Sequence, residues 1–175
     1  MASYTVSDYL LDRINIEDTI TKLLWYVDRQ NWDAVSALFA EEVVIDYTSM
    51  LGGEPVHTNG ADQVKVWKGM LEYLDSTQHV ASGILVDLPQ PTVDKPVQRP
   101  MKANFTCNVS AHLVRYAARG GPIIHNAGNY AIKFVRSSPD SMGHPWLVSA
   151  FKANIGFISG NTDVVKNPET KVGWL

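Results

Sequence analysis

The chain has 175 residues, of which 45% are hydrophobic and 19% are charged, and its formal net charge at pH 7 is -3. This length predicts one domain with a substantial core, and the hydrophobic share excludes a disordered chain. A single cysteine, Cys107, excludes an intramolecular disulfide, and without CxxC or HxxxH spacings the sequence is not that of a cysteine-rich zinc module. The charged share lies below the roughly 25% typical of soluble domains, so uncharged groups must cover or use much of the surface.

The charge pattern and the N-terminus narrow the range of partners. Lysines and arginines occur singly along the chain, which argues against a nucleic-acid partner. The first residues have neither the basic start nor the apolar run of a secretory signal, and no stretch approaches the roughly 18 apolar residues of a membrane span. We therefore expect a soluble, cytoplasmic protein that contacts neither nucleic acid nor membrane.

The first half of the chain has the periodicity of helices. Apolar residues at helical spacing predict a helix over 16–29, and shorter helices are expected over 32–40 and 60–74. Each is preceded by an asparagine that can cap it, the first by Asn15. The β-branched, alternating segment 43–49 predicts a strand between the second and third helices.

The second half of the chain has the pattern of strands. Four are predicted, over residues 77–87, 101–117, 122–136 and 146–158. The last three are long and are joined by short loops, so we expect them to be antiparallel. Helices followed by a meander indicate an α+β fold in which helices pack on one face of a curved sheet. The domain is expected to span 1–160, and the polar tail 161–175 either extends freely or closes over the domain as a pocket lid.

Asp28 is the first candidate for chemistry. It lies four residues after Leu24 on the first predicted helix, at the edge of the apolar face and toward the sheet. Burying a carboxylate there is costly without a partner, and a histidine is a natural partner for a group that works near neutral pH. The alternative is a solvated carboxylate at the margin of the helix, or a cap for the turn that follows.

Three of the five histidines are candidates to join Asp28. His79 lies at the start of a predicted strand, and His112 lies midway along the longest one. His125 shares an alternation face with Asn129, so both are expected to point toward the same space. Each imidazole alone is more often structural or exposed. Together with Asp28 and a phenol, Tyr47, this set would supply a base, an orienting carboxylate, a hydrogen-bond donor and an amide.

The alternation of strand 101–117 conflicts with the place of His112 in that set. The apolar face carries the odd-numbered residues from Phe105 to Leu113, which leaves His112 on the polar face. Three alternatives stay open at this stage. A β-bulge resets the phase, or the pocket face of the sheet is itself polar, or His112 points away from the core.

Short blocks along most of the chain carry a family resemblance. They are Val27-Asp28, Asn31-Trp32-Asp33, Val44-Ile45-Asp46-Tyr47, Thr77-Gln78-His79, Ala111-His112 with Arg115-Tyr116, and Phe151-Lys152-Ala153-Asn154-Ile155. In these blocks the sequence resembles the SnoaL-like branch of the NTF2-like superfamily, and within it the scytalone dehydratase family. The resemblance implies a cone: a curved mixed or antiparallel sheet wrapped around the N-terminal helices, with a pocket in its mouth.

The resemblance also implies an activity, the cofactor-free removal of water from a hydroxylated ketone. His79 would be the acid or base at the reacting carbon and leaving hydroxyl, Asp28 would orient a pocket histidine and balance its charge, and His112 would assist. Tyr47 would polarise the substrate carbonyl, and Asn129 would hold a substrate hydroxyl. The other residues expected to contact the substrate are Tyr26, His125, Phe151, Ile155 and Phe157.

The sequence departs from the family pattern at two pocket positions. Val27 stands where the dehydratase has a tyrosine, and the neighbouring Tyr26 is turned by about 100° on a helix. Ala127 stands where the family has a serine. The pocket is therefore expected to fit a substrate other than that of scytalone dehydratase.

We expect a cofactor-independent dehydratase that acts on a small oxygenated cyclic secondary metabolite. The first alternative is an isomerase or cyclase, pericyclic enzymes included, of a polyketide, terpenoid or alkaloid pathway. The second is a non-catalytic ligand-binding domain, which a separation of more than about 6 Å between Asp28 and both His79 and His112 would favour. A zinc site built from these three residues is a third alternative, although no metal or cofactor is expected. The low charge content also predicts a homo-oligomer, a dimer or a trimer, formed through the outer face of the sheet.

Overall fold

The computed structural model describes residues 4–92, 97–137 and 145–174. Its elements in chain order are α1 (Val6–Asp28), α2 (Trp32–Ser36), β1 (Phe39–Asp46), α3 (Thr48–Leu51), β2 (Val56–Thr58), α4 (Gly60–Leu71), β3 (Ser76–Asp87), β4 (Lys102–Val114), β5 (Ile123–Arg136), β6 (Trp146–Gly160) and the 3-10 helix η1 (Thr162–Val165). The predicted α+β class and the order of helices before long strands are confirmed.

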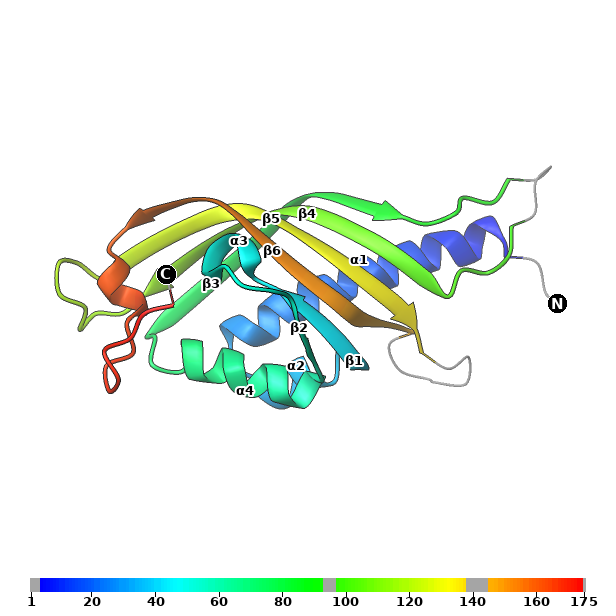
Figure 1. Ribbon diagram of the computed structural model, residues 1–175. Coiled ribbons are helices and arrows are strands. Elements are labelled where there is room, and N and C mark those ends of the chain that lie inside the picture. The colour runs from blue at the N-terminus through cyan, green and yellow to red at the C-terminus, as the bar shows by residue number, and fades with distance from the viewer. Residues whose placement is uncertain (1–3, 93–96, 138–144, 175) are drawn as a thin grey trace.

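The strands form one curved, unclosed sheet in the order β2-β1-β6-β5-β4-β3. All neighbours are antiparallel except β1 and β6, which are parallel. The long strands arch over α1, and α2 and α4 lie on the same side of the sheet (Figure 1). The core fills the space between these layers, and its largest fully buried side chains are Trp146, Phe105, Phe134, Ile16, Ile20 and Leu23. The cone implied by the family resemblance agrees with this arrangement.

Helix α1 begins ten residues before the predicted start at Ile16. Its N-terminus is fixed by a capping box, in which the Thr5 hydroxyl accepts from the Asp8 amide at 3.1 Å and the Asp8 carboxylate accepts from the Thr5 amide at 2.9 Å. Asn15 is therefore an interior helical residue rather than a cap. The early turns escaped prediction because their apolar residues, such as Leu10 and Ile14, are exposed and form no inward-facing stripe.

The segment between α1 and α4 also differs from its prediction. Helix α2 ends at Ser36, and β1 starts at Phe39, four residues before the predicted strand. The strand ends at Asp46, after which the chain turns into α3, because the Asp46 carboxylate accepts hydrogen bonds from the Thr48 amide and hydroxyl. The predicted cap Asn59 of the third helix is confirmed, since its side chain accepts from the Asp62 amide.

A β-bulge changes the phase of β6 halfway along its length. The register between β5 and β6 shifts at Ala127 and Gly128. Gly128 allows the two backbones to approach closely, because a Cβ there would lie 1.9 Å from the carbonyl oxygen of Asn154. Ile155, just before the bulge, faces the concave side, whereas Phe157, just after it, faces outward and contacts His125.

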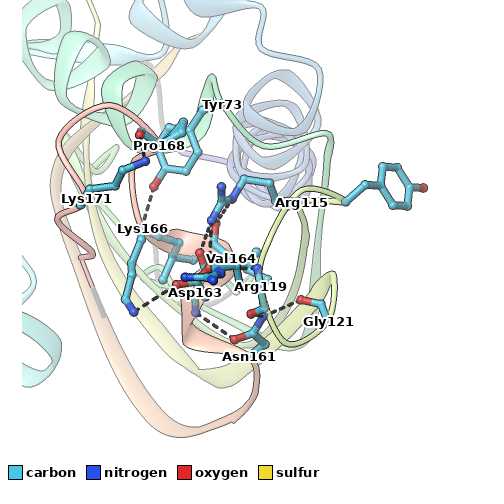
Figure 2. A network of polar contacts seen from close by, with 12 residues as sticks. Tyr73, Arg115, Arg119, Gly121, Asn161, Asp163, Val164, Lys166, Pro168 and Lys171 are labelled. Carbon is cyan, nitrogen blue, oxygen red and sulfur yellow. Dashed lines mark hydrogen bonds and ion pairs between the residues drawn. The ribbon is translucent and has the colours of Figure 1, made fainter.

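The C-terminal segment returns to the helices and is tied to the sheet by polar contacts (Figure 2). The Arg115 side chain donates to the backbone carbonyls of Asp163 and Val164, and the Tyr73 hydroxyl donates to the carbonyl of Val165. Farther along, the Trp174 indole donates to the Tyr73 hydroxyl at 3.1 Å. The end of the chain therefore lies against α4 and the turn that follows it.

Within the described ranges, no helix is both long and apolar enough to cross a membrane. The predicted domain limit at residue 160 and the predicted dimer or trimer remain predictions.

Candidate active site

A cavity lies between the concave face of the sheet and the helices α1 and α4. Together with its mouth, it holds about 670 Å³ of space not filled by atoms. Most of the wall is aliphatic or aromatic. The residues that line it are Leu23, Leu24, Val27, Tyr47, Met50, Trp67, Met70, Leu71, His79, Leu113, Asn126, Tyr130, Phe151, Ala153, Ile155 and Trp174. Among these the polar side chains are few, as is typical of sites that bind small molecules.

Asp28 and His79 meet at the wall of this cavity. His79 Nδ1 lies 2.6 Å from Asp28 Oδ1, and the two side chains are 13% and 11% exposed. Asp28 is the last residue of α1, and its carboxylate also accepts from the His79 amide at 2.7 Å and from the Thr77 hydroxyl at 2.8 Å. One carboxylate therefore fixes both the start of β3 and the orientation of the imidazole.

These contacts decide the charge of Asp28 and the tautomer of His79. Burial alone would raise the pKa of Asp28, but the hydrogen bonds from His79 and Thr77 and the charge of His79 outweigh burial and lower it. The ionised carboxylate keeps a proton on Nδ1, so Nε2 is the nitrogen left for other partners. Since His79 lines the cavity and Nε2 has no partner among the described residues, this nitrogen is available to a ligand.

Tyr47 is the second predicted site residue that faces the cavity. It follows β1 directly, and its hydroxyl accepts a hydrogen bond from Trp67 Nε1 at 2.8 Å. Burial raises the pKa of Tyr47, while the hydrogen bond from Trp67 acts in the opposite direction. Tyr47 and Trp67 both pack on the ring of Phe151, at centroid distances of 6.1 and 5.5 Å. The phenol is therefore neutral at physiological pH and held in a fixed place.

Two polar cavity residues, Asn126 and Tyr130 on β5, were not predicted from the sequence. They are 7% and 9% exposed, and neither side chain has a hydrogen-bond partner in the part of the chain that the structure describes. Burial, with the nearby Tyr47 hydroxyl, raises the pKa of Tyr130. The polar atoms of both side chains are reached from the cavity rather than sealed in the core, so they are available to hydrogen-bond a polar ligand there.

Five other predicted site residues are not brought to the cavity. His112 and His125 are cross-strand neighbours on the convex face of the sheet, where their rings stack at 4.3 Å. His125 also contacts the Ser110 hydroxyl at 2.8 Å and the ring of Phe157. On the same face, Asn129 accepts a hydrogen bond from Asn154 at 2.9 Å. Tyr26 packs partly buried against the core without lining the cavity.

Strand phase explains these differences. On β4 the odd-numbered residues are buried, so His112 points outward, which is one of the three alternatives left open by its alternation. On β5 it is the even-numbered residues that face inward, and His125 and Asn129 are on the other side. The bulge turns Phe157 outward, whereas Phe151 and Ile155 line the cavity as predicted. His79, His112 and Asp28 therefore do not converge, and no cluster of three metal-binding side chains occurs among the described residues.

The fold and the cavity define a class of proteins, NTF2-like α+β domains with a pocket inside a curved sheet. The model of the SnoaL-like domain matches residues 8–152, and the chain belongs to this family. No curated protein matches the sequence.

Solved structures share the fold at low sequence identity. A Kribbella flavida protein is 18% identical, with a TM-score of 0.74 over 87% of this chain and 95% of that one. A protein of Novosphingobium aromaticivorans, provisionally named a scytalone dehydratase, is 19% identical, with a TM-score of 0.69 over 89% and 91%. A type 2 hexachlorocyclohexane dehydrochlorinase is 15% identical, with a TM-score of 0.68 over 89% and 92%.

Proposed function

We propose that the protein is a cofactor-independent dehydratase that acts on a small, oxygenated, cyclic secondary metabolite. The observation that carries the proposal is the open Nε2 of His79, on a ring that Asp28 holds at the wall of a largely apolar cavity. A base held in this way beside a largely apolar wall suits proton transfer from carbon. The names of the structural neighbours, a provisional dehydratase and a dehydrochlorinase, are consistent with elimination chemistry.

The proposed reaction is an elimination next to a carbonyl group. His79 Nε2 takes the proton from the carbon beside the carbonyl, and the electron pair of the broken C–H bond delocalises into an enolate. The Tyr47 hydroxyl donates to the enolate oxygen as negative charge develops. The enolate then forms the C=C bond and expels the β-hydroxyl group. That group leaves as water with the proton carried by His79, which returns the imidazole to its starting state.

The wall of the cavity favours a substrate without a carboxylate or phosphate group. Among its lining residues, all within the described ranges, there is no lysine or arginine to pair with a carboxylate or phosphate. Asn126 and Tyr130 offer hydrogen bonds to further oxygen atoms of the substrate, in place of the role predicted for Asn129. The C-terminal tail is proposed to close the cavity, because Trp174 lines it while its indole is held by Met70 and Tyr73.

An isomerase is the second candidate function. The same dyad can move a proton between two carbons of a ketone without expelling a group, and the cavity contains no residue that distinguishes the two outcomes. Both reactions begin with removal of the proton next to the carbonyl. In an isomerase His79 returns that proton to another carbon, whereas in a dehydratase the proton leaves with the hydroxyl group as water.

The proposal is tested with a panel of cyclic β-hydroxy ketones in heavy water. Mass spectrometry detects deuterium uptake next to the carbonyl and the loss of water. Replacing His79 with Asn should reduce both by at least about a hundredfold, because the base is removed while the shape is nearly kept. The control is His57→Asn, which removes an exposed imidazole on β2. Exchange at the wild-type rate in His79→Asn would contradict the proposal, and exchange without loss of water would favour the isomerase.

A further inference from the structure

The hydrogen bond between Trp67 and Tyr47 can have only one direction. An indole Nε1–H is a donor and never an acceptor, so the Tyr47 oxygen accepts at 2.8 Å. The phenolic hydrogen takes no part in this bond, and no described residue accepts it. Because Tyr47 lines the cavity, the cavity is the place where that hydrogen finds an acceptor.

Packing holds this direction in place. Trp67 is buried on α4, with its ring 5.6 Å from that of Phe39 and 5.5 Å from that of Phe151. Turning the indole away from Tyr47 would bury its N–H without a partner and disturb both ring contacts. Tyr130 provides a contrast in the same cavity, since its hydroxyl is free to donate or to accept.

We propose that Trp67 is a positioning residue that makes Tyr47 a one-way donor, so that the substrate atom at Tyr47 is an accepting oxygen. This inference rests on the proposed function and specifies it: the oxygen is that of a ketone, which becomes an enolate during the reaction. As charge builds on that oxygen, the Tyr47 hydrogen moves toward it, and the indole N–H stabilises the charge left on the phenol. A substrate hydroxyl that donates to the Tyr47 oxygen instead would leave the phenolic hydrogen without an acceptor, which is costly in a buried place.

The test uses 4-nitrophenol, whose phenolate places an anionic oxygen on a planar ring. Its affinity is compared with that of 4-nitroanisole, which has the same ring and no anionic oxygen. The wild-type protein should prefer the phenolate. Trp67→Phe should reduce this preference by about three- to tenfold, the usual effect of one hydrogen bond. Tyr47→Phe should reduce it further, and the double variant should behave like Tyr47→Phe, because Trp67 acts through that hydroxyl.

Tyr130→Phe is the matched control, since it removes from the same cavity a phenol hydroxyl to which the Trp67 indole does not donate, its N–H being bonded to Tyr47. The losses in Trp67→Phe and Tyr130→Phe should simply multiply in the double variant. If Trp67→Phe does not fold, 3-benzothienylalanine at position 67 keeps the shape of indole without its N–H. The inference is overturned if the wild type shows no preference for the phenolate. It is also overturned if loss of the N–H leaves the preference unchanged, or if the losses at positions 67 and 47 multiply.

Binding of this ligand requires no turnover, so the two proposals fail separately. A preference that depends on Trp67 and Tyr47, with no deuterium exchange in any ketone, would leave the donor assignment standing and remove the dehydratase. If deuterium exchange depends on His79 but the preference for the phenolate does not change in Trp67→Phe, the dehydratase proposal stands and the donor assignment fails.

Discussion

Two aspartates of helix α1, the buried Asp12 and the largely buried Asp28, perform different tasks toward the two ends of that helix. Asp12 accepts from the Tyr4 hydroxyl at 2.9 Å, from Trp146 Nε1 at 3.1 Å and from the guanidinium of Arg136. Arg136 is in turn stacked on the Trp146 ring and bonded to a backbone carbonyl. At this end each partner is itself held by the protein, and Asp12 is not among the residues that line the cavity of the candidate site.

At Asp28 the network of hydrogen bonds ends at His79 Nε2, an atom without a partner among the described residues. The carboxylate is as firmly held as that of Asp12, but its partner His79 keeps one ring nitrogen directed to a cavity. The difference teaches that burial of a carboxylate does not by itself indicate function. What separates a structural site from a chemical one is a polar atom that the fold orients and then leaves without a partner.

The largest effect on stability is expected at Asp12, where every partner of the carboxylate is itself held by the protein. Asp12→Ala should lower the free energy of unfolding by about 3–5 kcal/mol, because the Arg136 side chain, 5% exposed, is left buried and unpaired. Urea denaturation measures this change. Asp18→Ala is the control on the same helix, at an exposed position where a change within about 0.5 kcal/mol is expected. A loss of less than about 1 kcal/mol for Asp12→Ala would contradict the structural role assigned to the Asp12 carboxylate.

A smaller effect with a distinctive pH dependence is expected at Asp28. Its pKa is lowered in the folded state, so its ionised form contributes stability above the unfolded value of about 3.9. That contribution is lost as the pH falls through the lower folded value. The wild type should therefore lose stability more steeply than Asp28→Asn below about pH 4. Parallel curves for the two proteins, measured by urea denaturation at a series of pH values, would contradict the assigned contacts.

The smallest effect is expected at the histidines of the convex face. His125→Asn should leave ketone exchange within about twofold of the wild type, since the His112–His125 stack lies on the side of the sheet away from the cavity. Its stability should change by no more than about 1 kcal/mol. A loss of exchange comparable to that in His79→Asn would show that the convex face takes part in the reaction.

The position of a site residue could be predicted from the sequence where it depends on a single helix or strand. The helix pattern placed Asp28 at the edge of an apolar face, and the family blocks added His79 and Tyr47 to the same site. The start of α1 was missed although the Thr5–Asp8 capping box is visible in the sequence, because the turns that follow it expose their apolar residues. Helix starts without an inward stripe are not recognised by periodicity.

The orientation of a side chain was predicted less well where it depends on how two elements pack against each other. The inward phase of β5 was available in the apolar residues Ile124, Ile132 and Phe134, which share parity with Asn126 and Tyr130. The reversal of Phe157 depends on the close approach of two backbones at Gly128. The contact of Trp67 with Tyr47 joins α4 to the end of β1, and only tertiary packing brings them within a hydrogen bond.

The central claim is that Asp28 keeps the proton of His79 on Nδ1 and leaves Nε2 open to the cavity. Nitrogen-15 NMR of histidine-labelled protein at about pH 8, with His79 identified by its absence from His79→Asn, tests this without a substrate. The account predicts a protonated Nδ1 and an unprotonated Nε2. A neutral ring with its proton on Nε2, or a ring that carries protons on both nitrogens at that pH, would contradict it.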